Sequence, residues 1–427
     1  MNRLSILFSI LIAGSLVLIS ACEKDPDKLQ LQAIEAVGTD LASGNTITKD
    51  LNGATAAVDV PTDSEITASF SKNVNLETVS ANISVSGGTT GGTMTIEVAD
   101  ADIILKFIDP LERGTDYTVT FGSGLEAEDG GGFSSITRTF STAGIKDVVP
   151  PQSASQVAYW PFNGNSNDAA GSYNGEAEVA MAWGTDRHGQ QGSCATFDGD
   201  ASIIEVPNAD PLGTTSDFTL SFWIKTNSDG HVNENGDPTG HFVMGLGAFF
   251  GFQFEIFGDY EGCKLAAQYD LGDGNSAPED TWYNGQEDLG WQGFTYARDL
   301  TGSGGLSALI KDKWAHIVCT YNSSTKEGSM YINGLIMKTF DFDLWPDGDA
   351  KRNVTGLKYS GQEPDVVNEL AFGFIQSRAG TMWDVEPWGG YDFPTSQHFK
   401  GQLDDVRIFH AALSAEEIET LYNDEKP

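Results

Sequence analysis

The fold of the larger part of this chain follows from the stretch Asp217-Phe218-Thr219-Leu220-Ser221-Phe222-Trp223-Ile224. Apolar side chains at 218, 220, 222 and 224 alternate with Thr219, Ser221 and Trp223. A period of two is typical of a β-strand. Short apolar runs recur at 316–321 and 330–332, and the second leads into Asn333-Gly334. That dipeptide favours a tight β-hairpin turn. These patterns predict antiparallel sheet.

One short helix is predicted at the C-terminus. Ser414 is a good N-cap, and Glu417 three residues later completes a capping box. Leu413 and Ile418 occupy the two positions of a hydrophobic staple. The pattern therefore predicts that a helix starts directly after Ser414.

Six strings spread over residues 156–423 carry a family resemblance. They are, in order, Ala158-Tyr159-Trp160-Pro161-Phe162-Asn163-Gly164-Asn165, Ala195-Thr196-Phe197-Asp198-Gly199, Asp217-Phe218-Thr219-Leu220-Ser221-Phe222-Trp223, Trp314-Ala315-His316-Ile317-Val318, Tyr331-Ile332-Asn333-Gly334 and Gly401-Gln402-Leu403-Asp404-Asp405-Val406-Arg407-Ile408-Phe409. Together they resemble the laminin-G-like, concanavalin A-like jelly roll of bacterial surface proteins. The resemblance implies two stacked antiparallel sheets over residues 156–427.

Residues 30–144 form a different module. Residues 22–150 hold six aromatic residues and residues 151–427 hold thirty-eight, and the change falls at a proline pair in the expected linker 145–155. Alternating apolar residues at 66, 68 and 70 and again at 117, 119 and 121 predict strands. The run Gly114-Thr115-Asp116-Tyr117-Thr118-Val119-Thr120 and its surroundings resemble a bacterial immunoglobulin-like family. The resemblance implies a β-sandwich that acts as a spacer, so the whole chain is expected to be all-β.

The first residues are expected to be a secretion signal. Arg3 precedes an apolar run at 4–19 that is too short to span a bilayer, and the run ends at Ile19-Ser20-Ala21-Cys22. This resembles a bacterial lipobox, which implies a signal peptide at 1–21, lipidation of Cys22 and a tether at 22–29. The following Glu23-Lys24-Asp25 resembles signals that send lipoproteins to the cell surface of the outer membrane. Three cysteines then remain, so at most one intramolecular disulfide is expected.

The composition limits the partners. The chain has 427 residues with 24 Lys plus Arg against 61 Asp plus Glu, a formal net charge of -37. Nucleic acids and anionic headgroups attract clustered Lys and Arg, so no nucleic-acid binding is expected and membrane contact is expected only through the lipid anchor. Neutral or cationic partners are favoured.

Two segments, 229–300 and 341–398, are not covered by the jelly-roll strings and are expected to be insertions. The first holds thirteen Asp plus Glu against two basic residues. The candidate ligand-binding residues of the two segments are the aromatic residues Trp282, Tyr283, Trp291, Tyr296, Trp345, Trp383, Trp388 and Tyr391. Aromatic faces beside acids and amides suit the C–H face and hydroxyls of a sugar. The alternative is that these rings form small satellite cores under the loops.

A structural calcium ion is a second expectation. The loop around Asn163 and Asp168 is dense in oxygen donors, which hard cations prefer. The family resemblance implies an ion near the first and last strands, with Asp404 and the turn at Asp198 as ligands. The alternative is an Asn-rich turn whose side chains bind their own backbone.

Catalysis is expected to be absent, although glucanases share this fold. The nearest carboxylate string is Glu255, Asp259 and Glu261, which would share one face only on an unbroken strand. Even there, Glu255 and Asp259 would lie about 13 Å apart. The sequence thus predicts a surface-anchored, non-catalytic protein that binds a polysaccharide or other glycan. The alternatives are an adhesin that binds a protein, such as a surface glycoprotein, and a glycoside hydrolase.

Overall fold

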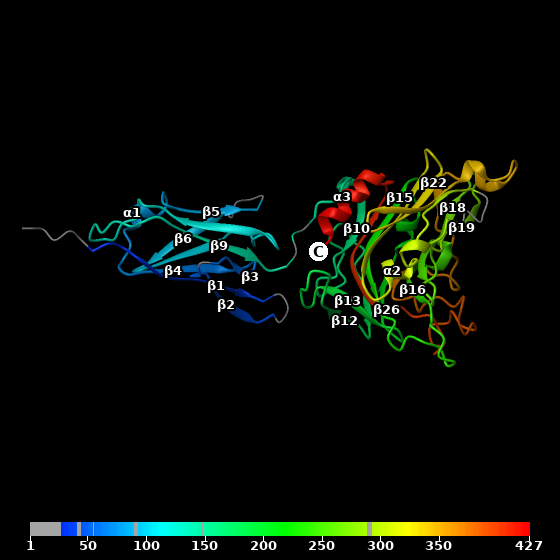
Figure 1. The fold of residues 1–427 in the computed structure, drawn as a ribbon, viewed down its shortest axis with the longest axis horizontal. Helices are drawn as coiled ribbons and strands as arrows, with labels where there is room; N and C mark the ends of the chain where they lie inside the picture. The colour runs from blue at the N-terminus through cyan, green and yellow to red at the C-terminus, as the bar shows by residue number, and fades with distance from the viewer. Residues whose placement is uncertain are drawn as a thin grey trace, which may run out of the picture. The chain divides into compact units, whose positions relative to one another are not determined.

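The computed structural model describes residues 27–40, 44–53, 55–88, 93–144, 146, 148–287 and 293–427. The chain separates into two compact units, the first ending at Ala143 and the second beginning at Gly144 (Figure 1). The predictions for Cys22 and Trp291 lie outside the described residues. Across the described ranges, no helix is both long enough and apolar enough to cross a bilayer.

The first unit is a β-sandwich. Its described strands form one sheet in the order β2 (Thr46–Asp50), β1 (Leu31–Thr39), β4 (Glu65–Phe70), β7 (Asp102–Phe107), β6 (Met94–Ala99), and a second in the order β3 (Ala57–Val60), β9 (Ile136–Thr142), β8 (Asp116–Phe121), β5 (Ile83–Gly87). A single helical turn, α1 (Leu76–Val79), precedes β5. The predicted alternation is confirmed, because Ile66, Ala68 and Phe70 of β4 are buried in the core between the sheets.

One sheet of the second unit contains nine of its described strands. They are, across the sheet, β12 (Ala182–Gly184), β13 (Cys194–Asp198), β26 (Lys400–Phe409), β15 (Phe218–Thr226), β21 (Trp314–Asn322), β22 (Glu327–Ile332), β23 (Leu335–Asp341) and β20 (Phe294–Ala297), with β10 (Gln156–Trp160) also paired to β26. The stretch 217–224 enters β15, where it lies between β26 and β21. At the β22–β23 turn, Asn333 and Gly334 have φ of 53° and 76°, so the predicted hairpin is confirmed.

The opposing sheet contains eight described strands. They are, across the sheet, β11 (Ala177–Val179), β14 (Ile203–Val206), β25 (Leu370–Phe372), β16 (His241–Leu246), β17 (Phe252–Ile256), β18 (Cys263–Asp270) and β19 (Ser276–Tyr283), with β24 (Gly356–Leu357) paired to β18. All pairings of both sheets are antiparallel. Phe222 of β15 and Phe254 of β17 meet between the sheets with ring centroids 5.0 Å apart. The all-β fold class with stacked antiparallel sheets is therefore confirmed.

The assignment of residues 229–300 as an insertion is corrected by these strands. The segment supplies β16, β17, β18 and β19, which are half of the eight-stranded sheet. Within 341–398, the strand β25 lies between β14 and β16 at the centre of the same sheet. Irregular chain remains at 227–240, at the turn after β17 and at 373–399.

The core between the sheets contains two of the three described cysteines, Cys263 and Cys319. Cys194, Cys263 and Cys319 are buried and form no disulfide with one another. Cys263 Sγ lies 3.6 Å from Met330 Sδ, and burial raises the pKa of the Cys263 thiol to about 12. These cysteines therefore act as small apolar side chains.

The C-terminal helix α3 (Ala415–Glu425) covers the outer face of the nine-stranded sheet. Its predicted capping box is confirmed: Ser414 Oγ accepts the Glu417 N–H, and the Glu417 carboxylate accepts the Ser414 N–H. Ile418 and Leu421 are buried against Val318 and Phe409 of the sheet. Further short helical turns are α2 (Ser307–Ile310) and the 3₁₀ turns Ser153–Ser155, Asp210–Gly213, Ala248–Phe250, Thr301–Ser303, Phe342–Leu344 and Ala350–Asn353.

Candidate functional site

A polar cleft of about 430 Å³ lies where three irregular segments of the second unit meet. Its walls come from the loop before β16, the turn after β17 and the chain before β26, the green and orange loops at the lower edge of the unit in Figure 1. We call it the loop cleft, and its lining includes Asn233, Glu234, Asn235, Gly258, Thr395 and Gln397. Amide, hydroxyl and carboxyl groups dominate this lining, which suits a ligand rich in hydroxyl groups.

A side-chain-capped turn shapes the first wall of the loop cleft. Asn233 Oδ1 accepts the backbone N–H of Asn235 at 2.9 Å and that of Asp237 at 3.0 Å. The Asn233 N–H in turn bonds to the Asp237 carbonyl. An Asn side chain that closes its own turn in this way pre-forms the wall without a ligand.

Two glycines let the three walls approach each other. A Cβ at Gly240 would collide with Gln397 Oε1, and a Cβ at Gly258 would collide with the carbonyl of Pro238. The backbone contact at 258 therefore requires glycine, whereas a side chain at 240 would displace the Gln397 amide from the cleft.

One exposed indole lies beside the loop cleft. Trp388 is 41% exposed, and its neighbour Pro387 accepts a hydrogen bond from Thr395 Oγ1 of the cleft. The ring of Trp388 lies 6.4 Å from that of Phe242, whose N–H bonds to the Gln397 carbonyl. Trp388 is not itself a lining residue, but these contacts join its segment to Thr395 and Gln397 of the cleft.

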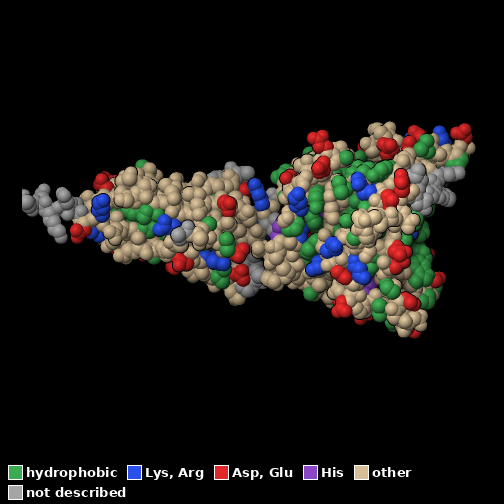
Figure 2. Space-filling model, viewed as in Figure 1, with side chains coloured by type: hydrophobic (Ala, Val, Ile, Leu, Met, Phe, Trp, Pro, Cys, Tyr) green, Lys and Arg blue, Asp and Glu red, His purple; other side chains and the backbone are tan. Residues whose placement is uncertain are grey.

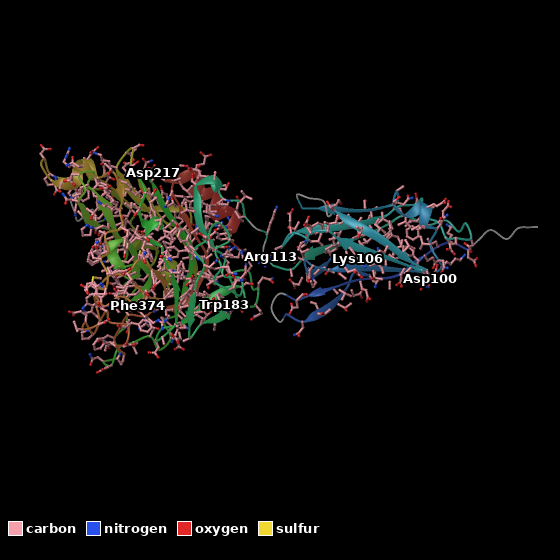
Figure 3. The ribbon with its side chains drawn as sticks, turned by 180° about the vertical axis from the view of Figure 1, so that it is seen from behind. Asp100, Lys106, Arg113, Trp183, Asp217 and Phe374 are labelled. Atoms are coloured by element: carbon pink, nitrogen blue, oxygen red, sulfur yellow. The ribbon has the colours of Figure 1, made fainter. Side chains whose placement is uncertain are left out.

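The other predicted rings of residues 341–398 have a packing role. Trp383 and Tyr391 lie against a satellite cluster on the eight-stranded sheet, which includes Phe374 (Figure 3). The members of this cluster are Ile203, Phe242, Ala248, Ala371, Phe374 and Ile375. Trp383 also contacts Trp388, with centroids 4.8 Å apart. The alternative of a satellite core therefore holds for Trp383 and Tyr391.

The predicted rings of residues 229–300 and Trp345 form a separate group near β20. Tyr283 is fully buried and Trp345 is 3% exposed, so the prediction that these two contact a ligand is wrong. Trp282 is half-buried, and Tyr296 is 38% exposed. Among the described residues, no ring contact joins this group to Trp383 or the cluster around it. The predicted convergence of both sets of rings on one trough is therefore not found.

Sequence reasoning missed the amides of the loop cleft. Asn233 and Asn235 stand in the polar run 233–237, and Gln397 stands more than 150 residues later. The polar run predicts a turn. Gln397 comes close to this turn only because Phe242 of β16 pairs with His398. No spacing in the sequence predicts that pairing.

Three buried histidines stand behind the loop cleft. His231 Nε2 lies 3.1 Å from the Gly240 carbonyl, and its ring stacks on that of His241 with centroids 4.4 Å apart. His241 Nε2 lies 2.8 Å from Tyr260 Oη, and His398 Nε2 lies 2.8 Å from a backbone carbonyl. Burial lowers the pKa of all three, that of His241 to about 3, so the rings are uncharged at neutral pH.

The three carboxylates considered for catalysis do not share a strand face. β17 ends at Ile256, so Asp259 and Glu261 lie in the following turn. Glu255 instead forms an ion pair with Lys264 at 3.4 Å on the outer face of the sheet, and burial raises its pKa. The unbroken strand that this arrangement required is absent.

The four residues considered for calcium do not form one ligand set. The Asp168 carboxylate accepts the backbone N–H groups of residues 159, 170 and 173, and that of Asp198 accepts those of residues 200, 201 and 202. Asp404 is paired with Arg187, which lines the same opening as Asn163. Within the described residues, no group of three or more His, Cys, Asp or Glu side chains is placed to hold a metal. Asp168, Asp198 and Asp404 thus already bind protein groups, and calcium binding stays a prediction.

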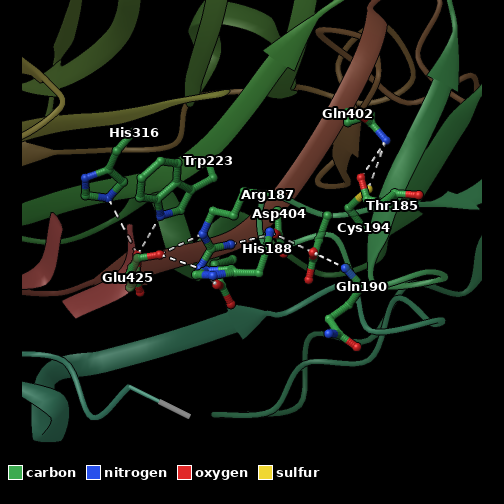
Figure 4. A network of polar contacts seen from close by, with 12 residues as sticks. Thr185, Arg187, His188, Gln190, Cys194, Trp223, His316, Gln402, Asp404 and Glu425 are labelled. Atoms are coloured by element: carbon green, nitrogen blue, oxygen red, sulfur yellow. Dashed lines mark hydrogen bonds and ion pairs between the residues drawn. The ribbon is translucent and has the colours of Figure 1, made fainter. Parts of the chain in front are cut away.

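A buried ionic network holds α3 on the nine-stranded sheet (Figure 4). We call it the α3 network, and its members are Arg187, Asp404, Asp405, Arg407 and Glu425. Arg187 pairs with Asp404 and Asp405 at 2.5 Å each, and Arg407 Nε pairs with Glu425 Oε1 at 2.8 Å. The side chains are at least 88% buried, with exposures of 1% for both arginines and for Glu425 and 12% for Asp405.

Neutral groups complete the α3 network. Trp223 Nε1 donates to Glu425 Oε2 at 2.8 Å, and Tyr159 Oη donates to Asp405 Oδ1 at 2.5 Å. Burial and the neighbouring Asp405 charge raise the pKa of Asp404 well above its usual value. Burial would raise the pKa of Asp405 as well, but Arg187 and Arg407 lower it. His316, bonded to Ser221, is uncharged because burial lowers its pKa to about 3.

Comparison with known proteins gives two family matches. Residues 46–142 match the bacterial Ig-like domain, and residues 198–366 match the concanavalin A-like lectin/glucanases superfamily. No curated protein matches the chain.

The chain is also similar in fold to solved structures of neurotoxin binding domains. The binding domain of botulinum neurotoxin DC in complex with rat synaptotagmin II has 14% identity and a TM-score of 0.38, over 63% of this chain and 51% of that chain. The botulinum neurotoxin serotype D binding domain has 15% identity and a TM-score of 0.39, over 64% and 52%. The chain thus spans about half the length of these structures, and so distant a likeness carries no argument about ligands. The family matches and the two units together show that this chain carries a bacterial Ig-like domain followed by a concanavalin A-like, laminin G-like domain.

Proposed function

We propose that this protein is a non-catalytic glycan-binding protein whose second unit holds the glycan in the loop cleft. The observation that carries the proposal is a pre-formed polar cleft of about 430 Å³ beside the exposed indole of Trp388. A sugar ring packs its C–H face on an aromatic ring, while its hydroxyls bind fixed amides and carboxylates. Asn233, Asn235 and Gln397 offer such groups.

The absence of catalysis is part of the proposal. Hydrolysis of a glycosidic bond needs two facing carboxyl groups about 5 to 9.5 Å apart across the sugar. Glu234 is the one carboxylate among the described lining residues of the loop cleft. Asp259 and Glu261 follow the lining residue Gly258 but are not lining residues themselves, so the lining does not supply the pair that cleavage needs, which supports binding.

The test is binding of the full chain to an array of neutral and charged glycans, followed by titration of the best ligand. Trp388→Ala should weaken binding at least tenfold, because an exposed aromatic anchor is lost. Tyr296→Ala is the matched control, since Tyr296 has a similar exposure but belongs to the group near β20. Binding to no glycan, or equal losses in both variants, would overturn the proposal, and tight binding to a protein instead would favour an adhesin.

We also propose that lipidation of Cys22 anchors the protein in the outer membrane, with the Ig-like unit as a spacer. The lipobox-like end of the N-terminal apolar run supports this anchor. Incorporation of labelled fatty acid should occur in the native chain and be lost in Cys22→Ala. Proteolysis of intact cells should remove the protein if it faces the outside. Persistence under protease would place it inside.

A further inference from the structure

The charges around the loop cleft restrict the glycan that it accepts, an inference that rests on the proposed function. Among the described lining residues there is one carboxylate, Glu234, and no lysine or arginine. Asp237 follows in the same turn, and Asp259 and Glu261 flank the lining residue Gly258 on the opposite wall. All four carboxylates are exposed and therefore accessible to a ligand. The loop before β16 and the turn after β17 therefore both carry exposed carboxylates, of which Glu234 lies in the lining itself.

Three basic residues of the surrounding segments are engaged elsewhere, while Lys311 lies over the ring of Tyr260 in the turn after β17 and outside the lining. Lys264 pairs with Glu255 and Asp280 on the outer face of the sheet, and Arg378 pairs with Glu205 at 2.6 Å. Lys400, which lies on the other side of the loop before β16, donates to the Asp229 carbonyl. No described cation is therefore placed in the lining to neutralise an acidic ligand.

We infer that the loop cleft selects glycans that carry free amino groups and disfavours uronic and sulfated glycans. An ammonium group within about 4 Å of an exposed carboxylate gains roughly two- to fivefold in affinity. A carboxylate or sulfate group placed there meets repulsion of similar size from Glu234 and from the opposite wall. Acidic side chains are scattered along the lower edge of the second unit in Figure 2, so the field there extends beyond one residue.

The test uses two hexasaccharides that differ only in charge: fully acetylated chitohexaose and fully deacetylated chitosan hexamer. The full chain should bind the deacetylated form about five- to thirtyfold more tightly in low salt. The advantage should shrink in 0.5 M NaCl, where the Debye length falls to about 4 Å. A hexamer of galacturonic acid should bind more weakly than either.

Variants distinguish the cleft from the general acidity of the chain. Glu234→Gln should reduce the preference for the deacetylated form two- to fivefold, measured as the ratio of the two dissociation constants, whatever change it makes to binding of the acetylated form. Glu327→Gln, an exposed acid on β22 of the other sheet, is the matched control and should change neither. Equal binding of both hexamers, or the same loss in both variants, would overturn the charge selection while the proposed function stands. Failure of every glycan to bind would overturn the proposed function itself.

Discussion

The α3 network and the loop cleft use the same kinds of side chain and differ in where those side chains find partners. In the α3 network, Glu425 bonds to Arg407 and to Trp223 Nε1, and all three side chains are buried. In the loop cleft, Glu234 and Asn235 are exposed. Apart from the backbone hydrogen bond of Asn235 in the turn that shapes the wall, they make few contacts with the rest of the protein.

The difference separates a role in stability from a role in binding. A buried charge that loses its partner is costly, so each member of the α3 network is held by the others. An exposed carboxylate or amide exchanges water for ligand at little cost, which leaves it available for recognition. The string Leu403-Asp404-Asp405-Val406-Arg407, which the family resemblance linked to calcium, belongs to the first kind.

The largest expected effect is on stability when the α3 network is broken. Glu425→Ala leaves Arg407 and the Trp223 N–H buried without this carboxylate, so the free energy of unfolding of the second unit should fall by about 3–5 kcal/mol. All nine Trp lie after residue 150, so urea unfolding followed by Trp fluorescence reports this unit alone. Glu419→Ala, an exposed acid on the same helix, should cost no more than about 0.5 kcal/mol. A loss below 1 kcal/mol for Glu425→Ala would contradict the role assigned to the network.

The next effect is a loss of stability in acid from buried histidines. Burial lowers the pKa of His241 and His316 to about 3, whereas the unfolded chain has a pKa near 6.5. The unfolded chain therefore binds protons that the folded one does not. Their contribution is fully present above pH 6.5 and is lost as the pH falls from about 6.5 toward 3, by roughly 2–3 kcal/mol per histidine at pH 4.5.

Carboxylates of the α3 network act in the opposite direction. Burial raises the pKa of Asp404 and Glu425, so their contribution to stability is present at low pH and is lost as the pH rises through the raised values.

The histidine prediction is tested with His241→Gln, behind the loop cleft. This variant should lose less stability than the native chain between pH 7 and pH 4.5, measured by urea midpoints at the two pH values. An unchanged difference between those midpoints would show that His241 is charged in the folded protein.

A third experiment separates the two indoles that contact each other. Trp383→Ala should destabilise the second unit by about 2–3 kcal/mol, because it opens the satellite cluster near Phe249 and Phe374. Trp388→Ala should cost less stability than Trp383→Ala and should lose glycan binding, because Trp388 is 41% exposed although its ring contacts those of Trp383 and Phe242. Thermal unfolding and glycan titration of both variants measure the split. Equal stability losses would make Trp388 part of the core.

Sequence patterns predicted most of the fold because periodicity reports burial. The dipeptide Asn333-Gly334 and the capping box at Ser414 each specify local geometry, and both are confirmed. The strand at 218–224 is confirmed too, but both of its faces are buried. The segment 229–300 was misassigned because no family string covers it. Its alternation of Phe252, Phe254 and Ile256, all buried, was the available signal for β17.

The candidate site was predicted less well because it depends on contacts between distant segments. Aromatic content does not distinguish a ring in the core, such as Tyr283, from an exposed one, such as Trp388. The carboxylate of Asp404 was predicted to face an ion, but its partner Arg187 stands more than 200 residues away. The order of the strands in the sheet determines which residues this far apart in the sequence become partners.

The smallest expected effect tests how α3 is held. Ser414→Ala removes the side-chain acceptor of the Glu417 N–H and should cost about 1 kcal/mol in the native background. If the α3 network holds the helix on the sheet, Glu425→Ala already frees much of the helix. Adding Ser414→Ala should then cost clearly less than 1 kcal/mol, because the two changes act on one element. Full additivity in the urea midpoints would mean that α3 stays docked through Ile418 and Leu421 alone, and that the network stabilises the sheet rather than the helix.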